Sequence, residues 1–137
     1  MEHAGKNFPE ITVETAPFWE GCKNEQLLIQ QCRHCGHYQF YPRLMCTNCM
    51  NRDVAWKEAS GKGKVKTYTI IHRAISEAYM KEAPYVLAII ELEEGPTMMS
   101  NVVNCNPDEV YVGQKVEVTF EKWSEEVTIP KFSPFSS

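Results

Sequence analysis

The sequence predicts a mainly β protein in three parts: an N-terminal arm and helix (residues 1–26), a cysteine-rich ribbon (residues 27–59) and a C-terminal barrel of five strands (residues 60–137). Three observations support this prediction. Two Cys-x-x-Cys pairs occupy the ribbon segment, the turn cluster Ser-Gly-Lys-Gly at 60–63 marks a change in composition, and short alternating strands follow it. Because 137 residues suit one compact unit or two very small ones, the ribbon needs support beyond a core of its own.

The composition excludes several classes of protein. Six cysteines among 137 residues fall below the roughly 8–10% typical of a disulfide scaffold. No apolar run approaches the length that spans a bilayer, and the first residues carry acids and a proline where a signal peptide needs basic and then apolar residues. We therefore expect a cytoplasmic protein without a membrane partner. The net charge of −4 argues against a nucleic-acid partner, since such proteins neutralise phosphates with Lys and Arg.

The first part contains one short predicted helix, from Thr15 to about Lys23. Residues 1–12 show neither helical nor strand periodicity and are expected to form an arm that a partner orders. Thr15 can cap the helix, and Pro17 falls in the first turn, where its missing N–H costs little. The apolar residues of the helix recur three or four positions apart: Phe18, Trp19 and Cys22.

The second part carries the strongest motif. A strand from Leu27 to Cys32 leads into a segment without apolar periodicity, in which the two cysteine pairs are separated by ten residues: Cys32 and Cys35, then Cys46 and Cys49. Each Cys-x-x-Cys turn places two thiolates on one side of a tetrahedral ion, and Gly36 suits the tight turn that follows the first pair. The pattern predicts zinc, one per chain, in a structural site, because four protein ligands leave no position open for substrate.

Three other interpretations of the motif are weaker. His34 or His37 could replace a cysteine ligand, but four cysteines already stand at ribbon spacing. Iron is chemically allowed in a tetrahedral thiolate site. A redox Cys-x-x-Cys of the thioredoxin type lacks the βαβ pattern that would surround it. Cys22 and Cys105 stand apart from the two pairs in sequence, and we expect them to be buried apolar side chains.

The third part has the pattern of a small antiparallel Greek-key barrel, and the OB type is the leading candidate, with an SH3-like barrel as the alternative. Glu94-Gly95-Pro96 is expected to form a hairpin turn, residues 74–84 an irregular insertion, and Pro130 is expected to place its strand at an edge or end. Alternating or continuous apolar patterns mark five strands: 65–73, 85–92, 97–103, 116–121 and 127–132.

Charge is divided unevenly between the parts. The segment from Cys22 to Lys66 carries eight Lys or Arg and three acidic residues, whereas the rest of the chain is strongly acidic. A solvated face is the ordinary explanation of such a segment, and a phosphorylated ligand such as an acyl-CoA nucleotide is the functional one. The chain has no phosphate-binding glycine loop, nucleophile elbow or other catalytic set that its sequence reveals, so we expect no catalytic residue.

The order of these elements resembles the family of domains of unknown function number 35 (DUF35), which combines an N-terminal helix, a rubredoxin-like zinc ribbon and an acyl-CoA-associated OB-fold. The resemblance extends from about residue 15 to residue 123. Besides the two cysteine pairs, the segments that carry it are Phe18-Trp19-Glu20-Gly21, Tyr41-Pro42-Arg43, Ala83-Pro84-Tyr85, Glu91-Leu92-Glu93-Glu94-Gly95 and Gly113. One departure is Thr47, since the family often has proline after the third cysteine.

The resemblance implies a role. Members of the family are non-catalytic subunits that bind thiolase-like enzymes and help to form the acyl-CoA site, for thiolytic or related C–C bond chemistry in aromatic-compound, sterol or isoprenoid-precursor metabolism. Carried over, the four cysteines would bind zinc, and Phe18, Trp19, Tyr41 and Arg43 would contact the partner or CoA, in a heterotetramer with two copies of each chain. Two alternatives stay open: a nucleic-acid-binding ribbon and OB-fold module, and a rubredoxin-like electron carrier.

Overall fold

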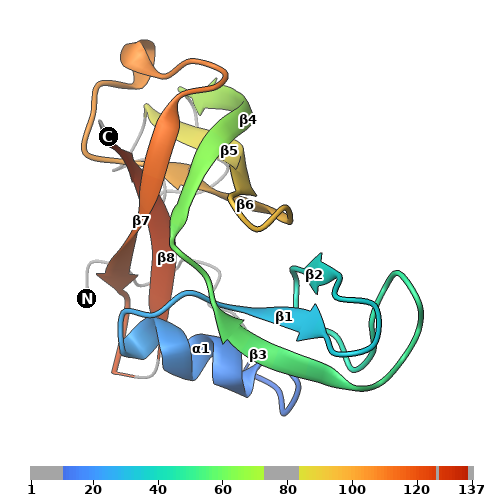
Figure 1. The fold of residues 1–137 in the computed structure, drawn as a ribbon. Helices are drawn as coiled ribbons and strands as arrows, with labels where there is room; N and C mark the ends of the chain where they lie inside the picture. The colour runs from blue at the N-terminus through green and yellow to red at the C-terminus, as the bar shows by residue number, and fades with distance from the viewer. Residues whose placement is uncertain (1–10, 73–83, 126, 136–137) are drawn as a thin grey trace.

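A small sheet and a closed barrel, joined by a short linker, make up the computed structural model, which describes residues 11–72, 84–125 and 127–135. In Figure 1 the barrel stands upright and the ribbon extends sideways from its lower end, with the helix α1 (Ala16–Lys23) below the start of the ribbon. This arrangement confirms the predicted fold class. Residues 1–10 of the expected arm, which spans 1–12, and most of the expected insertion at 74–84 lie outside the described residues.

α1 forms where the sequence predicts it, with Thr15 at the N-cap position and Pro17 in the first turn. The Thr15 side chain does not cap the helix, because its Oγ1 accepts a hydrogen bond from the backbone N–H of Thr12 at 3.0 Å. The buried face of α1 packs against strands of both the ribbon and the barrel. At Gly21 an added Cβ would lie 2.8 Å from Cγ of Leu28, so glycine allows the helix to approach the ribbon closely.

The ribbon is a three-stranded antiparallel sheet in the order β2-β1-β3. Its strands are β1 (Leu28–Cys32), β2 (Tyr38–Gln39) and β3 (Val54–Glu58). The sequence pattern predicts β1 but not β2 or β3. β2 is only two residues long, which is too short for alternation to be visible, and the outer part of β3 is exposed.

The barrel is closed, with the strand order β4-β5-β6-β8-β7. Its elements are β4 (Lys62–Ile71), β5 (Tyr85–Leu92), β6 (Thr97–Val102), the 3₁₀ turn η1 (Pro107–Glu109), β7 (Lys115–Lys122) and β8 (Thr128–Pro134). The prediction of a wholly antiparallel barrel is wrong in one place, since β6 and β8 pair in parallel at Val102 and Phe132. The chain crosses through η1 and β7 after β6, so β8 closes the barrel in the same direction as β6.

Two further expectations are corrected by the strand register. The alternation predicted from Val65 onward is interrupted by a bulge between Val65 and Thr67, after which Tyr68 and Ile70 rather than Thr67 and Thr69 are the less exposed residues. Pro130 does not mark an edge strand, because β8 lies between β6 and β7. β6 pairs with β8 only beyond Pro130, so the missing N–H of proline interrupts no ladder on that side.

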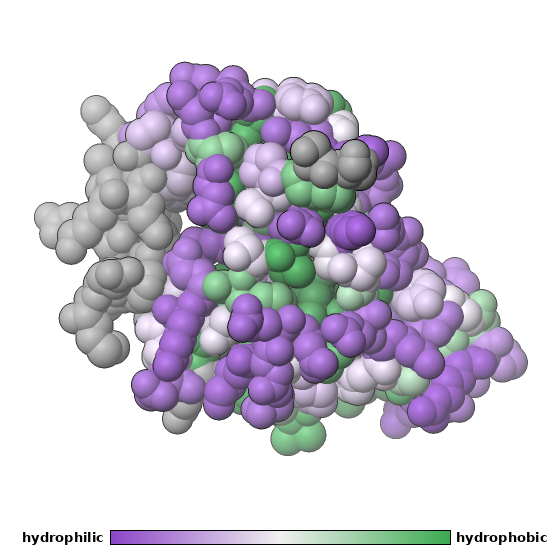
Figure 2. All heavy atoms as spheres, turned by 60° about the vertical axis from the view of Figure 1, so that its left-hand side comes forward, coloured by the Kyte–Doolittle hydropathy of each residue, from purple (hydrophilic) through white to green (hydrophobic). Residues whose placement is uncertain are grey.

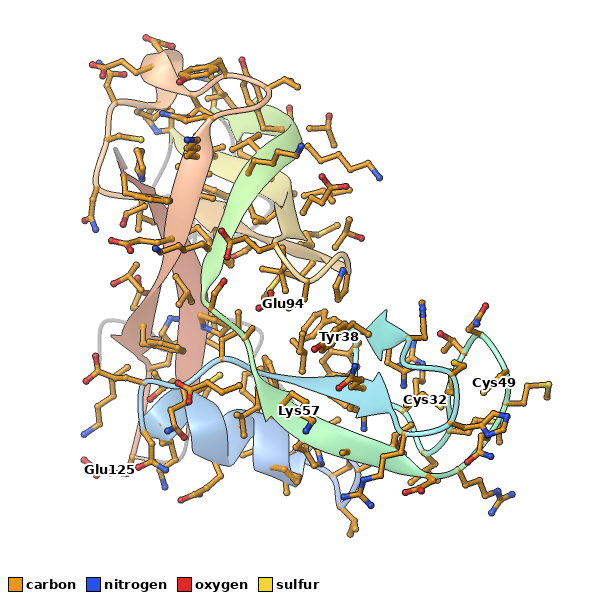
Figure 3. All side chains as sticks on the ribbon, in the orientation of Figure 1. Cys32, Tyr38, Cys49, Lys57, Glu94 and Glu125 are labelled. Atoms are coloured by element: carbon orange, nitrogen blue, oxygen red, sulfur yellow. The ribbon has the colours of Figure 1, made fainter. Side chains whose placement is uncertain are left out.

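One continuous core joins the helix, the ribbon and the barrel. Phe18 of α1 and Ile29 of β1 belong to the same buried cluster as Ile90 and Phe132 of the barrel. The linker adds a polar tie, because the backbone N–H of Ser60 donates to Oε2 of Glu94 at 2.8 Å. In Figure 3, Glu94 lies at the part of the barrel that faces the ribbon. The ribbon, which cannot bury enough surface alone, is therefore packed against the barrel.

On the face drawn in Figure 2, apolar side chains gather in a small central area that is surrounded by hydrophilic ones. Among the described residues, no helix has the length and apolar content that crossing a bilayer requires.

Candidate functional site

The four ribbon cysteines come together as one cluster. The Sγ atoms of Cys32 and Cys49 are 3.6 Å apart, as are those of Cys35 and Cys46, and all four lie within 4.8 Å of one another. A tetrahedral ion with metal–sulfur bonds near 2.3 Å would separate its ligands by roughly 3.8 Å. The donor set and its dimensions therefore fit a closed thiolate metal site. Figure 3 places Cys32 and Cys49 at the end of the ribbon that is remote from the barrel.

Backbone N–H groups surround the sulfur atoms in the same way at both turns. Two of them donate to the first cysteine of each pair at 3.3–3.4 Å: those of His34 and Cys35 to Cys32, and those of Asn48 and Cys49 to Cys46. Such bonds stabilise a thiolate, because the charged sulfur accepts hydrogen bonds more strongly than a neutral thiol. The ribbon thus favours a negative cluster, and a bound cation would balance it.

The repetition extends to the residue four positions after the first cysteine of each pair. Gly36 donates its N–H to the carbonyl of Cys32, and Met50 donates its N–H to the carbonyl of Cys46, both at 2.9 Å. Both residues have positive φ, +78° and +65°. The sequence identifies Gly36 as a turn glycine. For Met50 the only sequence signal is its position, four residues after Cys46, which matches that of Gly36 after Cys32.

The surroundings separate the pKa values of two thiols in the cluster. The backbone N–H of His37, followed by the side-chain amide of Asn48, lowers the pKa of Cys35 to about 6. The backbone N–H of Asn51 lowers the pKa of Cys49, but burial and the neighbouring cysteines together raise it, to about 12. The hydrogen bonds therefore favour the thiolate at Cys35, and a metal that binds all four sulfurs would also require Cys49 to lose its proton.

Two buried glutamines, which the sequence analysis did not single out, hold the loop before the second cysteine pair. Gln30 Oε1 accepts the backbone N–H of Arg43 at 2.8 Å, and its Nε2 donates to the Arg43 carbonyl at 2.9 Å. Gln39 Nε2 donates to the Met45 carbonyl at 3.1 Å, and its Oε1 accepts the N–H of Thr47 at 2.9 Å. Gln30 could have been found from the sequence, because it is a polar residue within a predicted strand.

The residues carried over from the family resemblance lie next to one another. The rings of Phe18 and Tyr41 are 6.2 Å apart, and the guanidinium carbon of Arg43 is 5.9 Å from the centre of the Tyr41 ring. Arg43 is exposed and Tyr41 is half-buried, whereas Phe18 and Trp19 are buried. The structure thus joins the helix aromatics to the ribbon loop, and it leaves Arg43 most accessible to another molecule.

A groove of 790 Å³ lies where the three parts meet, and we call it the junction groove. It is bounded by α1, the ribbon loop at residues 40–41, parts of β5, β6 and β8, the loop at 103–107 and the end of β7. Phe18, Trp19 and Tyr41 all line it. Its size is that of sites that hold small ligands or several side chains of a partner.

An ion pair sits in the wall of this groove. Lys131, with a side chain only 7% exposed, places its Nζ 3.2 Å from the carboxylate oxygens of Glu121. Trp123 Nε1 donates to Glu121 Oε1 at 2.7 Å, and the Lys131 ammonium lies 5.9 Å from the centre of the Trp123 ring. Lysine is rarely buried so fully unless it is paired, so the pair gives the groove one specific polar feature.

The two remaining cysteines lie outside the cluster. Cys22 is fully buried on α1, and burial raises the pKa of its thiol to about 12. Cys105 is partly buried, and burial, followed by the negative charge of Glu109, raises the pKa of its thiol. Both are free thiols with little thiolate at neutral pH. Among the described residues, the cluster of Cys32, Cys35, Cys46 and Cys49 is the one group of side chains found to be arranged for metal binding.

A four-cysteine ribbon followed by a closed five-stranded barrel defines the class of zinc-ribbon and OB-fold proteins. Two family models match consecutive parts of the chain: the rubredoxin-like zinc ribbon domain of ChsH2 over residues 19–55, and the C-terminal OB-fold domain of ChsH2 over residues 56–121. A DUF35 domain-containing scaffold protein of Methanocaldococcus jannaschii is 41% identical over 111 residues, which cover 79% of this chain and 77% of that protein. The chain belongs to the DUF35 family.

Two further relatives are longer proteins. A probable enoyl-CoA hydratase alpha subunit of Thermomonospora curvata is 33% identical over 92% of this chain, which spans 39% of that protein. A 3-oxo-4,17-pregnadiene-20-carboxyl-CoA hydratase alpha subunit of Mycobacterium tuberculosis is 29% identical over 85% of this chain, which spans 37% of that protein. The similarity therefore concerns less than half of each subunit.

Two solved structures share the fold. A chain of the Ltp2-ChsH2(DUF35) aldolase superposes with a TM-score of 0.83 at 33% identity, over 93% of this chain and 98% of that one. A DUF35 protein of unknown function from Sulfolobus solfataricus superposes with a TM-score of 0.66 at 18% identity, over 90% of this chain and 86% of that one. The second likeness extends to the fold alone.

Proposed function

We propose that this chain is a non-catalytic subunit that binds a thiolase-like catalytic subunit and helps to form its acyl-CoA site. The observation that carries the proposal is the likeness to a chain of the Ltp2-ChsH2(DUF35) aldolase over nearly the whole of both chains. The names of the curated relatives, scaffold proteins and CoA-ester hydratase alpha subunits, agree with a subunit role. The reaction in view is thiolytic or related C–C bond chemistry on a 3-oxoacyl-CoA.

We further propose zinc as the metal, one ion per chain. Four thiols at tetrahedral spacing fill the coordination shell of zinc and leave no position for substrate, so the ion would hold the ribbon folded and take no part in the reaction. The residues that would hold it are Cys32, Cys35, Cys46 and Cys49. A rubredoxin-like carrier would instead contain iron in the same site, and the two differ in colour and in metal content.

The contact surface of the proposal is the ribbon loop together with the helix aromatics. Arg43 is exposed beside Tyr41, where it can meet a phosphate of CoA or an acidic side chain of the partner. Phe18 and Trp19 line the junction groove beside that loop. We propose a cytoplasmic heterotetramer with two copies of each chain.

Co-expression with the thiolase-like proteins of the same organism, one at a time, tests the proposal. We expect the two proteins to co-purify, with C–C bond cleavage or formation on a 3-oxoacyl-CoA by the complex and none by this chain alone. Arg43→Ala should raise the Kd for the partner or the KM for the acyl-CoA about tenfold, whereas Arg52→Ala, at another exposed ribbon position, should not. A fully active, soluble partner that never binds this chain would refute the subunit role.

Elemental analysis of the natively purified chain tests the metal. About one zinc per chain is expected in a colourless protein. A red, iron-containing protein would favour the electron carrier. Strongly salt-dependent oligonucleotide binding would favour the nucleic-acid module instead.

A further inference from the structure

We propose that the junction groove receives a short, uncharged apolar segment of the partner subunit. This inference rests on the proposed function for the existence of a partner, and it adds where that partner inserts and what chemistry the inserted segment has. Three features of the groove carry it: its apolar rim, an unpaired buried donor in its wall, and its electrical neutrality.

The rim of the groove exposes apolar surface of the described residues. Met99 lies on β6 at the groove and is 65% exposed, although it neighbours the buried Met98. Aromatic residues from both sides, among them Tyr41 and Tyr85, complete the lining. A large apolar hollow at the meeting point of three structural parts is typical of a binding site, because covering it removes apolar surface from water.

The wall of the groove contains a hydrogen-bond donor without an acceptor. Trp19 is 7% exposed, and its Nε1 is buried with no hydrogen-bond partner. Buried indole N–H groups usually find a partner, so this donor indicates that an acceptor arrives from outside the chain. Partial opening of the groove as a segment enters would bring a backbone carbonyl to the indole. A peptide segment supplies such carbonyls at every residue.

The charges at the groove define what kind of segment fits. Among the described lining residues, Lys131 and Glu121 are the charged ones, and they neutralise each other at 3.2 Å. A carboxylate or phosphate on the occupant would compete with Glu121 for Lys131, and an ammonium group would compete with Lys131 for Glu121. An uncharged apolar occupant leaves the ion pair of Lys131 and Glu121 intact. Burying such an occupant in the groove also requires no charged group to lose its water.

The first test compares two exposed apolar residues in the complex of the full chain with its catalytic partner. Met99 and Val112 are both 65% exposed, but Val112 lies in the loop before β7 and does not line the groove. Met99→Gln should raise the Kd for the partner at least tenfold by titration calorimetry, whereas Val112→Gln should change it less than twofold. Equal effects of the two substitutions, or no effect of either, would overturn the inference.

The second test addresses the indole donor. Replacing Trp19 by 3-benzothienylalanine, incorporated at this position alone, keeps the shape of the fused ring and puts sulfur in the place of the N–H. Because the free chain gives this N–H no acceptor, the variant should melt at the same temperature as the parent or higher, and its Kd for the partner should rise about threefold to tenfold. An unchanged Kd with unchanged stability would show that no acceptor reaches the indole.

Other occupants give different results in the same experiments. If the groove holds a second copy of this chain, the isolated protein will sediment as a dimer and Met99→Gln will make it a monomer, which overturns the inference. If it holds a small apolar carbonyl compound, octanamide will bind the isolated chain and Met99→Gln will abolish that binding but leave partner affinity intact, which also overturns it. Failure of the parent chain to bind any thiolase-like partner would refute the proposed function itself, whereas binding that Met99→Gln leaves intact refutes only this inference.

Discussion

Gln39 donates from Nε2 to Oε1 of Gln30 across 2.8 Å, and both side chains are almost completely buried inside the ribbon. The pair connects two strands of the sheet to the loop at residues 43–47 through further hydrogen bonds to its backbone. That loop carries Arg43 at one end and leads directly into Cys46. The glutamine pair therefore links the proposed contact surface to the metal cluster by a fully paired polar network.

Removing one member of this pair should destabilise the ribbon. Gln30→Leu leaves the backbone N–H and carbonyl of Arg43 without their side-chain partners, and each such group that stays unpaired away from water costs up to about 1–3 kcal/mol. We expect a loss on the order of 3 kcal/mol in the free energy of unfolding by urea denaturation. Gln31→Leu on the same strand, where the side chain makes one exposed bond to Gly36, is the matched control and should cost less than about 1 kcal/mol.

Loss of the metal should unfold the ribbon. A structural zinc site of this type contributes on the order of 10 kcal/mol of apparent folding free energy at neutral pH. Cys46→Ser should therefore give a chain that contains little metal by elemental analysis and is rapidly cleaved by protease between residues 33 and 53. Cys105→Ser, at a cysteine outside the cluster, should keep the metal and resist the protease. Full metal content in the Cys46→Ser protein would refute the assignment.

The buried thiol of Cys22 should resist iodoacetamide in the folded, metal-loaded protein. Burial raises its pKa to about 12, so its reactive thiolate stays scarce as the pH rises from about 5 to about 9. In urea the thiol is no longer buried, and its alkylation rate should rise with pH toward the ordinary pKa of a cysteine, about 8.5.

Mass spectrometry of the alkylated peptides, taken between about pH 5 and about pH 9, measures these rates. The urea-unfolded protein is the control. Alkylation of Cys22 in the folded protein at the rate seen in urea would show that burial does not protect its thiol.

The buried ion pair of the groove should be sensitive to removal of one partner. Lys131→Met removes the positive charge that balances the Glu121 carboxylate. Because the Glu121 side chain is 32% exposed, water replaces part of that interaction, and we expect a loss of about 2–4 kcal/mol in the free energy of unfolding. The exposed pair of Lys122 and Glu125 offers a comparison, since Lys122→Met should cost no more than about 1 kcal/mol. Thermal unfolding of both variants beside the parent would show whether burial makes the difference.

Local patterns in the sequence were enough to predict α1, the five barrel strands and the cluster of four cysteines. These features depend on residues close together in the chain: the spacing within each Cys-x-x-Cys pair, the period of an amphipathic helix and the alternation of a strand. Sequence patterns did not predict β2, β3 or the parallel pairing of β6 with β8, because these features depend on which segments meet in the folded chain. The edge position predicted for Pro130 was wrong for the same reason.

The sequence by itself determined the cluster of four cysteines and the family, because four cysteines at ribbon spacing and the segments around them are local signals. Only the tertiary structure decided how the helix, the ribbon loop and the barrel combine. It placed Trp19 against a groove with its N–H unpaired, and it buried Lys131 against Glu121, which lies ten residues away on the neighbouring strand. No periodicity in a chain encodes such contacts, since they arise when separate elements exclude water from a shared surface.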